Sequence, residues 1–354
     1  TDKLTATAGM RSYKSENSLK GFFGFGDWGW SSRTGEVVCF DQTDFRGAPC
    51  VNLDKETNDS GTLGRVNISY QIDEDRMIYG TWSEGFRPGG INRRGGIDPY
   101  KPDFLTNWEF GWKTKLADNR LVFNGAVFSE TWDDFQFAVL GQNGLTEIRN
   151  VGGARIRGVE MDLSWAATYN LRISGGLAIY DTETTKDFCG FNDLAGTPVE
   201  VCPAGTINPQ TGDPVDGPQA PSGTRLPVTA DFKGNLTARY NFDIGEAEAY
   251  WQASAVHEGG RTSDLRLLER DILGNLASYT TLDLSFGYKR DSWSLDFYLK
   301  NAFDERAELT KFVQCPEKVC GNADNAPVPG YEDGQVYTVT NQPRTFGIRF
   351  SQKF

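Results

Sequence analysis

Apolar and polar residues alternate with a period of two along most of this chain of 354 residues. Leu282, Leu284 and Phe286, for example, share one face of an extended backbone, whereas Asp283 falls on the opposite face. A helix with this pattern would spread its apolar and charged groups around the whole circumference. The alternation therefore predicts β-strands with one apolar and one polar face.

We predict twelve strands, and many of them are long. They cover residues 3–14, 61–72, 76–86, 105–117, 120–140, 145–166, 170–183, 225–242, 247–259, 277–290, 293–303 and 334–354. Strands in globular proteins usually have about five or six residues, whereas a tilted strand that crosses a bilayer needs about nine to eleven. The predicted lengths favour strands that span a membrane.

The predicted connections alternate between short and long. Tight turns lie at residues 73–75, 118–119, 167–169, 243–246 and 291–292. The other connections are long, at residues 15–60, 87–104, 184–224, 260–276 and 304–333, with one tight exception at 142–144. Short turns at one end and long loops at the other are typical of an outer-membrane barrel. We therefore predict an all-β fold, a transmembrane antiparallel up-and-down β-barrel with about 12 strands present.

A soluble β-sandwich or a secreted solenoid would also show alternation. The polar face of the predicted strands, however, carries many charges: Glu109, Lys113, Lys115, Glu160, Asp162, Asp231, Lys233 and Arg239. A lumen that holds water or a plug tolerates such charges, while the closed strand ladder satisfies the backbone polar groups. The charged inward face, the strand lengths and the one-sided loops favour the membrane barrel.

Composition narrows the possible functions. The chain has 36 Lys and Arg residues against 48 Asp and Glu, a net charge of −12, so it lacks the basic excess that binding nucleic acid requires. Its 9 Trp, 13 Tyr and 23 Phe are too many for a disordered chain. With one His and no recognisable catalytic motif, we expect no enzyme activity, no metal site and no cofactor.

Six cysteines form three local pairs in the predicted long connections. Proximity in the sequence predicts the disulfides Cys39–Cys50, Cys189–Cys202 and Cys315–Cys320. Metal binding is the alternative, but the spacing of two residues between cysteines that is typical of zinc sites is absent and no His lies near any pair. Disulfides indicate an oxidising compartment, and their positions place all three at the same end of the barrel.

Five segments, in order along the chain, resemble the TonB-dependent outer-membrane receptors. They are residues 77–92 (MIYGTWSEGFRPGGIN), 100–113 (YKPDFLTNWEFGWK), 150–160 (NVGGARIRGVE), 299–304 (LKNAFD) and 343–354 (PRTFGIRFSQKF). The resemblance implies that residues 1–354 are the C-terminal part of a 22-stranded barrel, with the plug domain and the early strands absent. Twelve strands could instead close as a small barrel.

The resemblance also implies a function and a set of partners. The full protein would lie in the bacterial cell outer membrane and take up a scarce large solute in a TonB-dependent manner: a ferric siderophore, cobalamin, haem or an oligosaccharide. Its partners would be membrane lipid and lipopolysaccharide, its own plug domain, TonB with the inner-membrane energising complex, and possible other outer-membrane or surface proteins. The alternatives are a passive substrate-specific porin and a structural barrel that anchors a surface complex.

Two groups of residues are candidates for contact with the substrate. Aromatic side chains between glycines suit stacking on flat ligands, although they could equally pack under their own loop: Phe22, Phe23, Phe25, Trp28 and Trp30. Arginines at another loop entry could bind an anionic siderophore or a lipopolysaccharide phosphate, or could form salt bridges: Arg87, Arg93 and Arg94. Phe350 and Phe354, in the alternating aromatic C-terminal segment, resemble the family's barrel-assembly signal.

Overall fold

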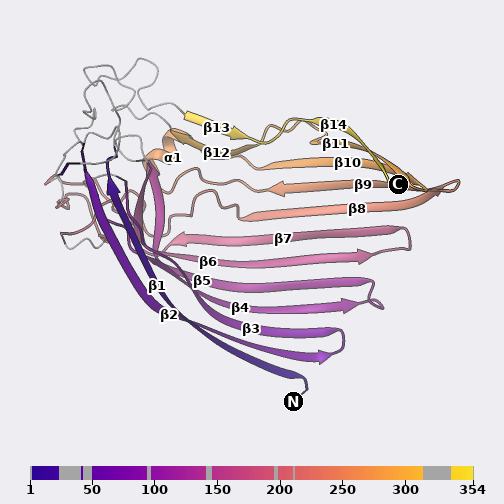
Figure 1. Ribbon diagram of the computed structural model, residues 1–354, viewed down its shortest axis with the longest axis horizontal. Coiled ribbons are helices and arrows are strands. Elements are labelled where there is room, and N and C mark those ends of the chain that lie inside the picture. The colour runs from indigo at the N-terminus through magenta and orange to yellow at the C-terminus, as the bar shows by residue number, and fades with distance from the viewer. Residues whose placement is uncertain are drawn as a thin grey trace.

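A computed structural model describes residues 2–23, 41–42, 50–93, 97–140, 146–194, 198–209, 212–313 and 336–353. Twelve strands form one antiparallel sheet in the order β1 to β11 followed by β14 (Figure 1). These strands are β1 (Leu4–Gly21), β2 (Leu53–Asp73), β3 (Arg76–Arg87), β4 (Asp103–Leu116), β5 (Leu121–Leu140), β6 (Thr146–Ala166), β7 (Leu171–Thr184), β8 (Phe232–Ile244), β9 (Ala247–Glu258), β10 (Tyr279–Arg290), β11 (Trp293–Lys300) and β14 (Thr345–Gln352). From β1 to β11 each strand pairs with the next one along the chain, and β11 pairs with β14, which confirms the predicted all-β meander.

The remaining elements lie in the long connections. A helix, α1 (Leu267–Leu273), follows β9, and β12 (Glu308–Val313) pairs with β13 (Val336–Thr340) as a separate two-stranded sheet. Neither the helix nor β12 was predicted. Among the described residues, no helix is long and apolar enough to cross a membrane.

Three predicted segments differ from the structure by more than a few residues, and local chemistry explains two of them. The strand predicted at 225–242 begins only at Phe232, because Pro227 has no backbone N–H and Val228 adopts a positive φ of 57°. The segment predicted as one strand at 334–354 is interrupted at 341–344, around Pro343, and forms β13 and β14 instead. The first connection is shorter than predicted, since β1 and β2 extend into it and pair from Leu4 with Tyr70 to Gly21 with Leu53.

The short turns and the long loops lie at opposite ends of the strands, and both chain termini lie at the turn end (Figure 1). The turn between β4 and β5 shows how the sequence makes such a reversal. Ala117, Asp118 and Asn119 all have positive φ angles, between 54° and 63°, and Asp and Asn tolerate this conformation better than most residues. We call the opposite end, which carries the long loops, the rim.

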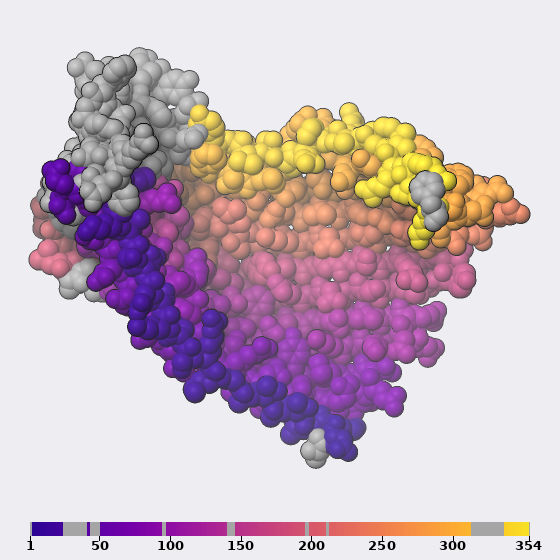
Figure 2. Space-filling view, in the orientation of Figure 1, coloured from indigo at the N-terminus to yellow at the C-terminus, as the bar shows by residue number. Residues whose placement is uncertain are grey.

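The two faces of the sheet separate apolar from polar side chains. Large hydrophobic side chains stay exposed on one face, including Trp108 at 62%, Ile179 at 51% and Phe346 at 65%. The other face is hollowed, and Figure 2 looks into this hollow. A recess of about 770 Å³ within it is lined by residues from β3 to β9. An outward apolar face and a polar hollow are the arrangement of a membrane barrel wall.

Candidate functional site

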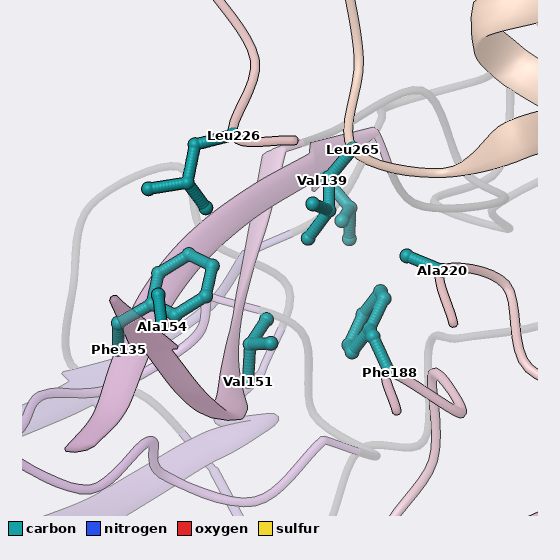
Figure 3. Close-up of a cluster of buried hydrophobic side chains, with 8 residues drawn as sticks. All are labelled: Phe135, Val139, Val151, Ala154, Phe188, Ala220, Leu226 and Leu265. Atoms are coloured by element: carbon teal, nitrogen blue, oxygen red, sulfur yellow. The ribbon is translucent and has the colours of Figure 1, made fainter. Parts of the chain in front are cut away.

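At the rim, side chains from four separate segments form a small hydrophobic core (Figure 3). Its members come from β5, β6, the β7–β8 loop and the β9–β10 loop: Phe135, Val139, Val151, Ala154, Phe188, Ala220, Leu226 and Leu265. All of them are buried, and Val151, Ala154, Ala220 and Leu265 have no measurable exposure. Burying this much apolar surface fixes the two loops against the extended ends of β5 and β6.

Hydrogen bonds join the same two loops to each other. The Val228 amide donates to the Thr262 carbonyl at 2.8 Å, and the Leu267 amide at the start of α1 donates to the Gln219 carbonyl at 2.8 Å. We call the described residues of the β7–β8 and β9–β10 loops the cap. Core and hydrogen bonds together make the cap one packed body over part of the rim.

The cap contains one of the predicted disulfides. Cys189 and Cys202 are bonded and buried at 3% and 0% exposure, and they pack with Phe191, which confirms that pair. Cys50 is also disulfide-bonded and buried. Its predicted partner Cys39 lies outside the described residues, as do Cys315 and Cys320.

An ion pair links two residues of the β7–β8 loop within the cap. Lys186 Nζ lies 2.7 Å from Glu200 Oε1, so this ion pair links two points of the β7–β8 loop that lie close to Cys189 and Cys202 in the sequence. Its hydrogen bond to Glu200 raises the pKa of the Lys186 ammonium above 10.5, despite an opposing effect of partial burial. The Lys186 ammonium therefore stays charged at any physiological pH.

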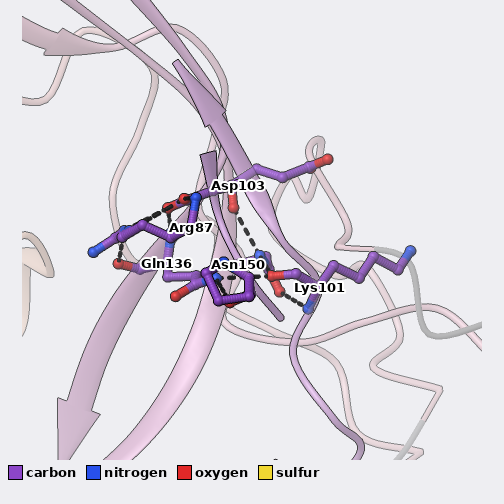
Figure 4. A network of polar contacts seen from close by, with 7 residues as sticks. Arg87, Lys101, Asp103, Gln136 and Asn150 are labelled. Carbon is purple, nitrogen blue, oxygen red and sulfur yellow. Dashed lines mark hydrogen bonds and ion pairs between the residues drawn. The ribbon is translucent and has the colours of Figure 1, made fainter. Parts of the chain in front are cut away.

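Arg87, a predicted substrate contact, takes part in a polar network at the root of the β3–β4 loop (Figure 4). Its Nε lies 3.1 and 3.0 Å from the two carboxylate oxygens of Asp103, which is 1% exposed, and its guanidinium lies 4.9 Å from the centre of the Trp132 ring. Gln136 donates its backbone N–H to the same carboxylate at 2.9 Å. Arg87 thus joins β3, β4 and β5 at the base of the rim.

Two buried asparagines from the family-like segments hold the β3–β4 loop against β6. Asn92 accepts a hydrogen bond from the Ile148 amide at 2.8 Å and donates to its carbonyl at 2.9 Å. Asn150 accepts from the Lys101 amide at 2.8 Å and donates to its carbonyl at 3.0 Å. Each asparagine side chain therefore accepts from the N–H and donates to the C=O of one residue, as the backbone of a neighbouring strand would.

The structure brings together one residue from each predicted substrate-contact group. The Arg93 guanidinium lies 5.9 Å from the centre of the Phe23 ring, a distance typical of a cation–π contact. Buried Asn52 accepts from the Phe23 amide and donates to its carbonyl, both at 2.8 Å, while Arg93 directly follows the anchored Asn92. Phe22 is partly buried beside this pair in sequence, and Phe25, Trp28, Trp30 and Arg94 lie outside the described residues.

The turn after β11 is held in the same manner. Asn301 accepts from the Glu305 amide at 2.9 Å and donates to the Gln342 carbonyl at 3.0 Å. Asp304 accepts from the Arg344 amide at 2.8 Å, and this backbone hydrogen bond lowers the pKa of the Asp304 carboxyl below 3.8. These contacts fix the point where β14 enters the sheet.

Below the rim, tyrosines bonded to carboxylates line the hollow of the sheet. The hydroxyl of Tyr79 donates to Glu109 at 2.7 Å and that of Tyr250 to Asp296 at 2.8 Å. Tyr180 with Glu160 and Tyr279 with Glu258 repeat the arrangement. The wall is therefore polar along much of its length, and it suits a hydrated solute or a polar domain rather than lipid.

Comparison with known proteins agrees with this architecture. The family model described as "TonB dependent receptor-like, beta-barrel" matches residues 1–302. The chain belongs to this family. Family members are bacterial outer-membrane barrels, so the predicted family, fold class and location are confirmed, and the exposed apolar face is the one that contacts lipid.

The relatives include receptors that are named for different ligands. The pesticin receptor of Yersinia pestis is 24% identical over 258 residues, which are 71% of this chain and 32% of that receptor. The metal-pseudopaline receptor CntO of Pseudomonas aeruginosa is 26% identical over 244 residues, 68% of this chain and 29% of that receptor. The chain thus covers about a third of the length of each.

Solved structures show the same fold. The ferric yersiniabactin uptake receptor FyuA of Yersinia pestis matches with a TM-score of 0.68 and 18% identity, over 100% of this chain and 44% of that one. The ferric-catecholate import receptor Fiu of E. coli matches with a TM-score of 0.62 and 16% identity, over 100% of this chain and 43% of that one. The chain as a whole thus shares its fold with part of each of these receptors.

Sequence reasoning missed the residues that hold the rim together. The family-like segments contain Asp103, Asn92 and Asn150. A match to a family motif, however, does not tell which loop each of these side chains contacts. Asn52 lay in a predicted loop and had no signal at all, because its partner, the Phe23 backbone, lies 29 residues away in the sequence.

Proposed function

We propose that the chain is part of a receptor that takes up a metal chelate, such as a ferric siderophore, in a TonB-dependent manner. Family membership supports the receptor class, since the homologues take up siderophores and metals. The residues would form the C-terminal twelve strands of the barrel wall, with a plug domain in the hollow and TonB acting from the periplasm. The polar hollow lined by tyrosine–carboxylate pairs suits such a plug.

The contact between Phe23 and Arg93 is the observation that supports a metal chelate as the substrate. A guanidinium next to an aromatic ring binds a ligand that is both anionic and flat, because the cation attracts charge while the ring stacks. Many metal chelates combine these properties. Asn52 and Asn92 fix the backbone on both sides, so less conformational freedom is lost when a ligand binds.

Growth and binding test this proposal. A strain that lacks the gene should grow poorly on ferric yersiniabactin, a ferric catecholate or metal-pseudopaline as the only metal source, and the intact gene should restore growth only when TonB is present. Uptake that persists without TonB would show a passive porin instead. Growth on none of these chelates would contradict the substrate class.

Single substitutions in the purified full receptor test the residues. Arg93→Gln should weaken binding of the chelate that supports growth about tenfold, the loss expected when one charged hydrogen-bonding group is removed. Arg306→Gln is the matched control, because it removes an arginine that is also exposed at the rim, at 59%, but outside this contact. Equal binding by the two variants would exclude Arg93 from the substrate site.

A further inference from the structure

A buried arginine of the cap holds the two-stranded sheet of β12 and β13, which lies toward the rim end of the molecule (Figure 1). Arg261 follows β9, and only 3% of its side chain is exposed. Its Nη1 donates to the Leu309 carbonyl at 3.1 Å and its Nη2 donates to the Glu308 carbonyl at 2.9 Å. Both carbonyls belong to β12, so one guanidinium fixes this strand against the cap.

The same guanidinium is paired with the lumen wall. Arg261 Nη1 lies 3.6 Å from Oε2 of Glu258, the last residue of β9, whose side chain is 17% exposed. The Tyr279 hydroxyl donates to the same oxygen at 2.7 Å, and Lys233 Nζ lies 3.3 Å from Glu258 Oε1. Glu258 and Lys233 both line the recess of about 770 Å³ in the hollow. Arg261 therefore connects the wall of this recess to β12.

Arg261 depends on Glu258 to remain buried. In the part of the chain that the structure describes, Glu258 is the only carboxylate that forms an ion pair with Arg261, and Arg261 Nε has no hydrogen-bond partner. When one member of a buried ion pair is removed, the remaining charge is left without compensation, which is costly. Loss of the Glu258 charge should therefore move the guanidinium toward solvent and away from the β12 carbonyls.

The two-stranded sheet offers little burial of its own. All five residues of β13 are exposed, and Phe312 on β12 is 42% exposed. At the base of the sheet, the Asn341 amide donates to the Ala307 carbonyl at 3.2 Å. A two-stranded hairpin is at best marginally stable in water by itself, so the contacts of Arg261 have a large effect on the position of β12.

We propose that Arg261 keeps β12 in place at the rim only while the Glu258 carboxylate is its counter-ion. A cationic group that enters the recess and pairs with Glu258 releases β12, because Arg261 then loses its counter-ion. The recess favours a cationic group, since its lining holds more carboxylates than ammonium groups: Glu109, Glu160, Asp162 and Glu258 against Lys113 and Lys233. The Glu258–Arg261 pair thus makes the outer surface respond to a change inside the lumen, whichever solute the receptor carries.

Hydrogen exchange of residues 308–313 in the purified full receptor tests the proposal. Glu258→Gln should speed exchange there about tenfold, because a hydrogen bond between charged groups contributes roughly this factor and exchange reports local opening. Glu109→Gln is the matched control, since Glu109 is also a recess carboxylate bonded to a tyrosine but lies on β4, far from β9 in the strand order. It should leave β12 unchanged. Residues 282–290 of β10 should exchange at the wild-type rate in both variants, which excludes a general folding defect.

Two further variants separate this role of Arg261 from a general weakening of the wall. Arg261→Gln should speed exchange of β12, and adding Glu258→Gln should speed it no further, because both changes break the same contact. Val256→Lys places an ammonium two residues before Glu258, on the same face of β9, and should speed exchange as Glu258→Gln does. Wild-type exchange of β12 in folded Glu258→Gln or Val256→Lys, or additive effects in the double variant, would overturn the proposal. The assay uses no solute, so its result is independent of the proposed function.

Discussion

Asp103, at the start of β4, is buried to 1% exposure beneath Arg87, and its carboxylate accepts hydrogen bonds from Arg87 on β3 and from Gln136 on β5 at the base of the rim. The Arg87 side chain itself is 48% exposed on its outer side. Arg87, which the sequence predicts as a substrate contact, therefore also shields the buried Asp103 carboxylate from solvent. Loss of either partner would act on the whole rim, because a buried charge without its partner is costly.

Asp103→Ala should destabilise the rim by about 3 kcal/mol, near the lower end of the range for breaking a buried ion pair, since Arg87 is half exposed. The measurement is the midpoint of thermal unfolding of the purified full receptor. Asp103→Asn should lose less, because its side-chain oxygen still accepts one hydrogen bond. Wild-type stability in Asp103→Ala would contradict the structural role of this acid.

Removal of the Cys189–Cys202 disulfide should open the cap without unfolding the barrel. A bond that closes a loop of this length contributes about 3 kcal/mol, and the strands below do not depend on it. Limited proteolysis should therefore cut residues 185–231 rapidly in the double variant Cys189→Ser with Cys202→Ser. Reduced wild-type protein should behave the same, and a resistant cap in both would show that the hydrophobic core alone holds it.

Gly287→Ala should impair folding through a clash within the hollow of the barrel. A Cβ atom at Gly287 would overlap the ring of Tyr250 from the adjacent strand, and the ring is held in place by its bond to Asp296. Overpacking of this kind costs about 1–3 kcal/mol. The fraction of folded barrel on an unheated gel should fall, and the second change Tyr250→Ala should restore it. No rescue would place the defect elsewhere.

Acid should weaken the turn between Asn301 and Arg344. The pKa of Asp304 is lowered below 3.8 mainly by the hydrogen bond from the Arg344 amide. The contact therefore stabilises the turn above about pH 4 and is lost as the pH falls through the lower folded value. Hydrogen exchange of residues 340–348, corrected for intrinsic rates, should be faster in Asp304→Asn than in the wild type near neutral pH. The two proteins should become equal in strong acid, and a difference that persists there would exclude Asp304 as the titrating group.

The sequence by itself determined the strands and their faces. The side chains of a strand alternate with a period of two, so local pattern alone located the central strands β3 to β7 and β9 to β11 within a few residues and separated the lipid face from the polar face. It also determined the short turns, where Asp and Asn favour the required backbone, and the Cys189–Cys202 pair, whose partners are close in the chain. The family-like segments pointed to the receptor class.

Only the tertiary structure decided how the rim is built. Leu226 and Pro227 continue a strand pattern, yet Leu226 leaves the sheet and is buried in the hydrophobic core at the rim, the same core that holds Phe135 and Leu265. Phe23 and Arg93 meet across 70 residues of sequence, held by asparagines whose partners no local pattern reveals. Such contacts depend on where distant loops pack, and period and motif carry no information about that.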